Sequence, residues 1–252
     1  MARGGYKPSD FDGRDKAWTI ETSNTAAVQL PRPALRDQGS EVDCCTSAAL
    51  ATAIESIDLN RGQETPLADL FHYYYARQDP KYLGSVTLRQ ALKVAATKGF
   101  CVLSLHSYAR TAEGARKIPS EEAKEDAKAH RLLAYDPITG LAGYYRLDGP
   151  GRVARWKAAL AEGQPIVVGL WTQDSYWQGS GILETESNAH RGAHAVAILG
   201  FDEAKQVFSA RDSRGASFAD EGEWPLGYAV VESAQVVESW TIRTLVPNTL
   251  QG

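Results

Sequence analysis

The most continuous helical pattern in the chain lies between residues 44 and 59, where small and apolar side chains recur at helical spacing. Alanine predominates in this stretch, and the apolar positions fall on most sides of the expected helix, which predicts a helix that is largely buried. These positions are Ala48, Leu50, Ala51, Ile54 and Ile57. We expect Asp43 to be the N-cap, with Gly62 shortly after the C-terminal end.

Helical patterns continue through the first half of the chain and give way to β patterns in the second half. Further helices are expected at 66–77, at 87–98 closed by Gly99, from Ser120 onward, and at 152–162. Strands are expected at 26–30, 163–171, 193–202, 206–213, 227–233 and 239–246. The glycine-rich region 134–152 predicts loops around a short strand at 144–147.

Because helices precede strands, the order predicts an α+β fold with segregated layers. We expect three regions along the chain: an extension at 1–30, a helical lobe at 31–125 and a β-rich lobe at 126–252. The first region is polar and irregular, and is too short to be an inhibitory pro-segment that folds on its own.

Composition and charge argue against several classes of function, namely nucleic-acid binding, membrane-spanning and secreted proteins. The net charge of -4 gives no electrostatic footprint for nucleic acid. No apolar run is long enough to cross a bilayer, and the polar start has no secretory h-region. Three cysteines, two of them adjacent, cannot form a disulfide framework, so we expect a cytoplasmic protein. We expect no cofactor and no metal.

The paired Cys44 and Cys45 stand where the 44–59 helix begins. A thiol reacts as the thiolate, and a free thiol with a pKa of about 8.5 is mostly protonated at neutral pH. The positive end of a helix dipole and an imidazolium both favour the thiolate. Gln38, a few residues upstream, is a candidate donor to an oxyanion. Cys44 and Cys45 could also be core residues, as we expect for Cys101.

His194 is the candidate partner, because it opens the apolar strand "AHAVAILGFD" and a polar ring at that place needs a partner. His72 and His130 lie in helical patterns and are expected to be structural or on the surface, and His190 to be exposed in a loop. His190 and His194 have no third ligand nearby, so the pair does not indicate zinc. Asp212, in "ARDSRG", could orient the imidazole, although a turn-forming role would explain it equally well.

In this order the segments resemble the papain-like cysteine peptidases of the C1 family. The matching segments are "RDQG", the helix ending in "AIE", "GQPIVVGL", "GAHAVAILGFD", "DSRG" and "GYAVV". The resemblance spans about residues 30 to 232 and implies a two-lobed fold with the active-site cleft between a helical lobe and an antiparallel β-barrel-like lobe. It implies a peptidase that forms a thioester, with Cys45 as nucleophile, His194 as acid and base, Asp212 as the residue that orients the ring, and Gln38 with the Cys45 amide as oxyanion donors.

Helix register selects Cys45 over Cys44. Counting back from Glu55 in the family's register gives Cys45, whereas counting forward from Gln38 gives Cys44. An insertion is tolerated in the loop "GSEVD", but one extra residue would rotate the helix by about 100 degrees. We therefore predict that Cys45 is the nucleophile.

The sequence departs from the family pattern at several positions. Asp212 stands where the family usually has asparagine, Thr46 follows the nucleophile where an aromatic residue is usual, and Arg214 replaces a tryptophan that shields the helper bond. We therefore expect that ring to be missing. Gly84-Ser85 falls where the family pairs with substrate backbone.

Three other functions remain open at this stage. The same residues would serve a peptide ligase or other acyltransferase, and the fold could be retained as a binding module without chemistry. Cys44 and Cys45 could also form a vicinal disulfide that acts as a redox switch. The expected partner is a peptide or protein substrate, with an unidentified regulatory protein in addition.

Overall fold

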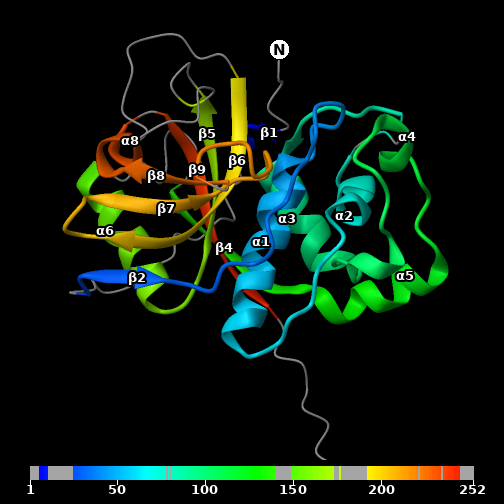
Figure 1. The fold of residues 1–252 in the computed structure, drawn as a ribbon, viewed down its shortest axis with the longest axis horizontal. Coiled ribbons are helices and arrows are strands. Elements are labelled where there is room, and N and C mark those ends of the chain that lie inside the picture. Colours follow the sequence, from blue (N-terminus) through cyan, green and yellow to red (C-terminus); the bar gives the residue numbers. More distant parts are fainter. Residues whose placement is uncertain are drawn as a thin grey trace, which may run out of the picture.

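A computed structural model gives the structure of the chain, and it describes residues 6–10, 25–77, 79, 81–139, 149–172, 176, 192–220, 222–233 and 235–244. Most helices gather on one side, and an antiparallel sheet lies on the other together with the helices at 149–161 and 228–232; the long helix α1 (Cys45–Asn60) stands between them (Figure 1). The predicted α+β class is therefore confirmed. His190 and the strand expected at 144–147 lie outside the described residues.

The described elements follow the chain in this order. The helices are α1 (Cys45–Asn60), α2 (Asp69–Ala76), α3 (Leu88–Thr97), α4 (Ala112–Ala115), α5 (Glu121–Asp126), α6 (Gly149–Ala161) and α8 (Tyr228–Glu232), with 3-10 turns at Leu103–Leu105 and Ala127–His130. The strands are β1 (Tyr6–Lys7), β2 (Ala27–Gln29), β3 (Val86–Thr87), β4 (Leu132–Thr139), β5 (Ile166–Thr172), β6 (Gly192–Asp202), β7 (Val207–Arg211), β8 (Glu223–Gly227) and β9 (Val236–Thr244).

The sheet has the strand order β4-β9-β5-β6-β7-β8, and β2 adds to β6 beyond this path. Every pair in it is antiparallel. Strand β6 is the longest, because it pairs with β5 along one part and with β7 and β2 along the other. It thereby carries the chain from the neighbourhood of α1 to the far side of the sheet (Figure 1).

Helix α1 packs against β5, β6 and β9, and nearly all of its residues are buried. Its small alanine side chains allow the helix to approach the sheet closely, as the sequence predicts. The expected N-cap is wrong by one residue: Cys44 occupies that position, and no side chain caps the helix. The N–H groups of the first turn have no partner within the helix.

A buried group of ions holds the middle of α1 to the preceding loop. Arg36 forms an ion pair with Glu55 of α1 and a longer contact of 3.5 Å with Asp69 of α2. Glu55 also accepts the backbone N–H of Leu67 at 2.6 Å. Burial raises the pKa of Glu55, although Arg36 opposes this shift. These contacts fix α1 relative to both neighbouring segments.

Two sequence predictions about the second half are wrong. Residues 228–232, expected as a strand, form helix α8, and the strand β8 precedes it. The region expected to be loops from residue 134 begins with strand β4, which pairs with β9 at the edge of the sheet. Pro137 is compatible with β4 because an edge strand needs hydrogen bonds on one side only.

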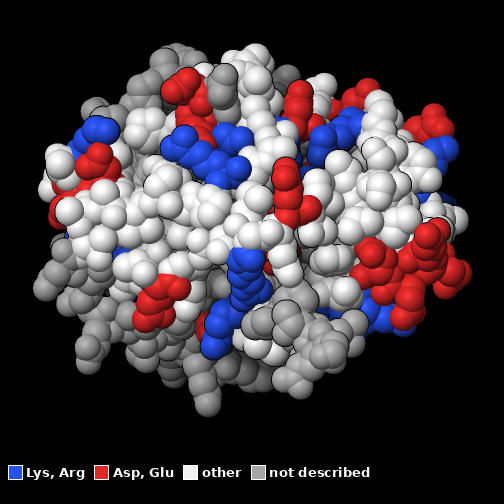
Figure 2. All heavy atoms as spheres, turned by 60° about the horizontal axis from the view of Figure 1, so that its bottom comes forward, with Lys and Arg blue, Asp and Glu red and all other residues white. Residues whose placement is uncertain are grey.

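No helix in the described parts of the chain is long and apolar enough to cross a membrane. The face drawn in Figure 2 carries charges of both signs. Several of the charged side chains on the helical side form ion pairs with residues three or four positions away in the chain, such as Lys117–Glu113 and Lys124–Glu121. This face therefore offers no continuous basic surface.

Candidate active site

The sheet brings His194 and Asp212 together from neighbouring strands. His194 lies near the start of β6, and Asp212 directly follows β7, which pairs with β6. The His194 Nε2 atom donates to Asp212 Oδ1 at 3.0 Å, and both side chains are fully buried. A ring held in this way has a fixed orientation and a fixed tautomer.

The other ring nitrogen of His194 faces the thiol of α1. Nδ1 has no hydrogen-bond partner of ordinary geometry among the described residues. The Cys45 sulfur lies close enough to contribute charge and hydrogen bonding to the ring. Burial lowers the pKa of His194, but Asp212 and Cys45 outweigh this effect and raise it to about 10. The ring is therefore protonated at neutral pH, between a carboxylate and a sulfur.

Asp212 is held as a carboxylate by four donors. Besides His194, the Ser213 N–H donates to Oδ1 at 2.7 Å, while Oδ2 accepts from the Tyr176 hydroxyl at 2.6 Å and Trp224 Nε1 at 3.2 Å. Burial opposes ionisation, but the His194 charge and the hydrogen bonds hold the Asp212 pKa below its ordinary value. The nitrogen of an asparagine amide could not accept the Trp224 N–H, which gives a reason for an acid at this position.

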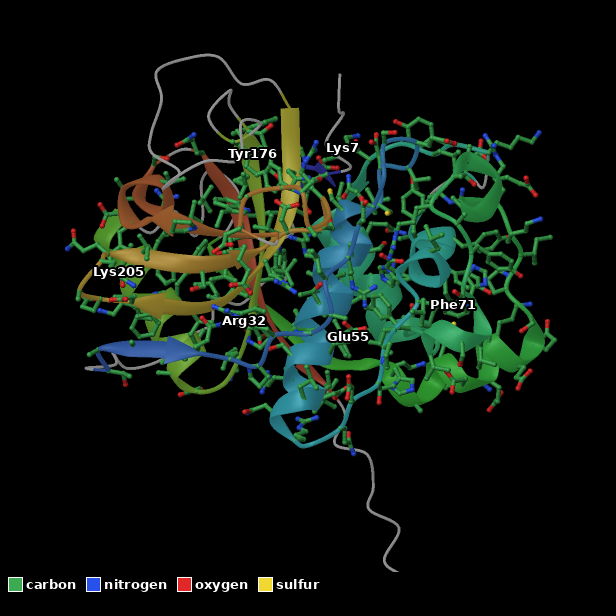
Figure 3. All side chains as sticks on the ribbon, in the orientation of Figure 1. Lys7, Arg32, Glu55, Phe71, Tyr176 and Lys205 are labelled. Atoms are coloured by element: carbon green, nitrogen blue, oxygen red, sulfur yellow. The ribbon has the colours of Figure 1, made fainter. Side chains whose placement is uncertain are left out.

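Aromatic rings surround the contact between His194 and Asp212. The Tyr176 ring lies 5.5 Å from the His194 ring and 5.2 Å from that of Phe218, and it packs edge-on to Trp224 at 5.5 Å. The expectation that a shielding ring is missing is therefore wrong. Arg214 replaces the family's tryptophan in the sequence, as noted above, but other segments supply rings. Figure 3 places Tyr176 near the end of the sheet where β5 and β6 lie.

Gln38 lies next to the loop that follows Asp212. Its backbone N–H donates to Ser213 O at 2.6 Å, and its side-chain Oε1 accepts the Ser213 hydroxyl at 2.8 Å. The residue is 3% exposed. With its oxygen held by Ser213, the amide NH2 end of Gln38 is the part that can donate to another acceptor.

Cys44 and Cys45 are both free and buried, but their surroundings differ. Burial raises the pKa of Cys44, the charge of Asp69 raises it further, and Arg110 opposes that shift. The charge of Cys45, in contrast, raises the pKa of His194. The first helical residue thus carries the thiol next to the imidazole.

The remaining described histidines lie elsewhere, as His72 illustrates. Its ring stacks on Phe100 at 4.2 Å between centroids, and its nitrogens contact Ser47 Oγ and Ala91 O at 2.8 and 2.9 Å. Burial lowers its pKa to about 4. His72 is a neutral core residue that links α1, α2 and α3.

The strand that follows Gly84-Ser85, the segment expected to pair with substrate backbone, pairs with the N-terminal part of the chain itself. Gly84 O accepts the Tyr73 hydroxyl at 2.9 Å, and the adjoining Val86–Thr87 strand pairs with Tyr6–Lys7. The sequence offered no signal for this pairing, because a strand of two residues has no readable periodicity.

Comparison with solved structures and curated proteins shows which proteins the chain resembles. Xylellain, a cysteine protease from Xylella fastidiosa, superposes with a TM-score of 0.84 and 26% sequence identity over 97% of each chain. The chain is a cysteine peptidase that resembles the papain-like C1 family. No family profile matches the sequence, so the resemblance to papain-like peptidases is a divergent one.

Two further relatives agree with this result. A peptidase C1-like protein of Acanthamoeba polyphaga mimivirus is 26% identical over 94% of this chain and 76% of its own length. Digestive procathepsin L 3 of Tenebrio molitor shares the fold, with a TM-score of 0.68 and 15% identity over 96% of this chain and 76% of that chain. The predicted two-lobed, papain-like α+β fold is confirmed.

Proposed function

We propose that this papain-like peptidase hydrolyses peptide bonds through a thioester formed on Cys45, with His194 as proton donor and acceptor and Asp212 as the residue that orients the ring. The observation that carries the proposal is the buried row of Cys45, His194 and Asp212. Asp212 accepts a hydrogen bond from Nε2 of the protonated ring. The other ring nitrogen, Nδ1, is then the one that can interact with the sulfur. That arrangement stabilises a thiolate–imidazolium pair.

A residue of this chain can then be assigned to each step of the reaction. The Cys45 sulfur attacks the peptide carbonyl carbon, and the negative charge on the oxygen is met by the Cys45 N–H in the first turn of α1 and the Gln38 amide. His194 gives its Nδ1 proton to the leaving amine, and a thioester remains. A water molecule then attacks the thioester, and His194 takes a proton from this water. The carboxylic acid product is released, and the Cys45 sulfur and the protonated His194 ring are restored.

The adjacent thiols provide matched variants for the test. Cys45→Ala should reduce cleavage of an unfolded protein substrate to background, whereas Cys44→Ala should keep it, because Cys45 and not Cys44 is the thiol that raises the pKa of His194. Product masses would be recorded at neutral pH under reducing conditions, with and without an added amine. Activity that survives in Cys45→Ala would refute the proposal, and amide products in place of acids would show acyl transfer.

A further inference from the structure

Residues 6–10 of the chain lie over the proposed nucleophile, between the two lobes. Strand β1 pairs in parallel with β3 on the helical side and lies against β6 on the side of the sheet. Figure 1 shows β1 beside the end of β6 and the first turn of α1. Tyr6 is 3% exposed, and the charge on Cys45 is among the causes that raise the pKa of its phenol, after burial and Glu238. A peptide substrate that reaches Cys45 must enter the same space.

The Tyr6 side chain fills a pocket that glycine keeps open. A Cβ atom on Gly169 would lie 2.2 Å from Tyr6 Cζ, so any larger residue at this place in β5 would collide with the ring. The neighbouring Lys7 points away and is exposed, and Figure 3 places it at the same end of the molecule as Tyr176. The pocket therefore accepts one aromatic side chain from the strand that lies across the site.

A buried carboxylate ends the pocket. The Tyr6 hydroxyl donates to Glu238 Oε1 at 2.7 Å, and the same oxygen accepts the Ser9 N–H and Ser9 hydroxyl at 3.0 and 2.9 Å. Trp240 Nε1 donates to Oε2 at 2.9 Å. Glu238 is 0% exposed, and burial raises its pKa.

Three of these four donors belong to residues 6–9, which are held to the helical lobe by a two-residue strand. A side chain that served only to pack β1 against the sheet would be apolar, because burying a carboxylate is costly without donors. Glu238 instead depends on donors from a short segment. When the segment leaves, Glu238 retains Trp240 and needs another donor from whatever fills the pocket.

We propose that the Tyr6 pocket is the specificity pocket of the peptidase and selects a tyrosine side chain of the substrate, whose hydroxyl donates to Glu238. Residues 6–9 then fill this pocket in the free protein and are displaced by substrate. The proposal rests on the peptidase function assigned to Cys45 above. Its substrates are peptides in which a tyrosine reaches Glu238 while a nearby carbonyl reaches Cys45.

Peptides that differ by one oxygen atom test the pocket. Tyrosine, phenylalanine and leucine would be placed in turn at each of the three residues before a cleavable bond in otherwise identical peptides. At one position, tyrosine should exceed phenylalanine roughly 10- to 100-fold in kcat/KM, because the hydroxyl bonds to a charged group. Glu238→Gln should reduce this preference to a few-fold, since the accepting charge is lost.

Variants of the N-terminal strand test the intramolecular occupant. Tyr6→Phe keeps the ring and the fold but removes the donor, so kcat/KM should rise. Tyr6→Ala should raise it by about tenfold or more, while Lys7→Ala on the same strand should leave it unchanged. Equal rates in all four proteins would refute the occupancy of the cleft.

The pocket and the peptidase function fail in different ways. Cleavage that depends on Cys45 but does not distinguish tyrosine from phenylalanine at any of the three positions would overturn the pocket and leave the peptidase intact. If no peptide is cleaved, fluorescence polarisation would measure the binding of labelled tyrosine and phenylalanine peptides to the double variant Cys45→Ala, Tyr6→Ala. Tighter binding of the tyrosine peptide would support the pocket, and equal or undetectable binding would overturn it.

Discussion

Replacing Asp212 by asparagine removes one negative charge from a buried contact and keeps the size of the side chain. His194 Nε2 lies 3.0 Å from Asp212 Oδ1, so the charge centres are about 4 Å apart. Two unit charges at that separation interact by about 4 kcal/mol at an effective dielectric constant of about 20, which equals about three pKa units. The pKa of His194, raised to about 10 in the parent protein, should fall to about 7 in the variant.

The pH dependence of kcat/KM reports this change. Acylation needs the protonated ring to supply a proton to the leaving amine, so activity is lost as pH rises through the pKa of His194. In the parent protein the alkaline loss should occur near pH 10. In Asp212→Asn it should occur near neutrality, about three units lower, with activity retained below it. NMR titration of the His194 ring would give the same two values.

An alkaline limb that stays near pH 10 in Asp212→Asn would refute the reasoning, because the Asp212 charge would not be what holds the ring protonated. The Trp224 N–H, which loses its acceptor in the variant, provides a separate readout. Loss of this hydrogen bond should lower the free energy of unfolding of the variant without moving the pH profile of kcat/KM.

Two further predictions concern stability. Glu55→Ala removes the partner of buried Arg36 and should lower the free energy of unfolding by about 3–5 kcal/mol in urea titration, whereas a loss below about 1 kcal/mol would show that Asp69 alone satisfies Arg36. Tyr176→Phe removes one donor from the Asp212 carboxylate and should cost about 1.5–3 kcal/mol. Since the bond stabilises the charged form and the Asp212 pKa is lowered, this cost should be present above the ordinary Asp pKa and shrink as pH falls, and a cost independent of pH would contradict it.

The helix register implied by the family resemblance decided the choice between the two thiols. The apolar spacing of residues 44–59 predicts a buried helix, and the structure begins α1 at Cys45. The strand carrying His194 was equally clear, because its apolar run is long and continuous. Such long periodic segments are dictated by local pattern and burial together.

The rings around His194 and Asp212 could not be predicted. Tyr176 and Trp224 are separated from Asp212 along the chain, and each lies in a segment without distinctive pattern. Their hydroxyl and indole groups meet one carboxylate only because the sheet brings the segments together. The sequence shows that Arg214 replaces one tryptophan of the family, but it does not show that Tyr176 and Trp224 supply aromatic rings instead.

The misassigned helix and strand are explained by their places in the fold. Residues 228–232 contain tyrosine and valine, which favour strands, yet they pack as a short helix against α6 and β9. Tertiary contacts therefore override a weak propensity. Strand β4 contains Asp136 and Pro137, which indicate a turn, but its place at the edge of the sheet tolerates both.

Strand β1 belongs to the same chain as β3 and β6, which it contacts, so dilution of the protein does not separate them. Because one chain carries all three strands, the local concentration of β1 at its place beside β3 and β6 is set by the chain itself. That value is the same at any abundance of the protein. A separate inhibitor would dissociate as both proteins become scarce, whereas a tethered strand yields only to a ligand that competes at this local concentration.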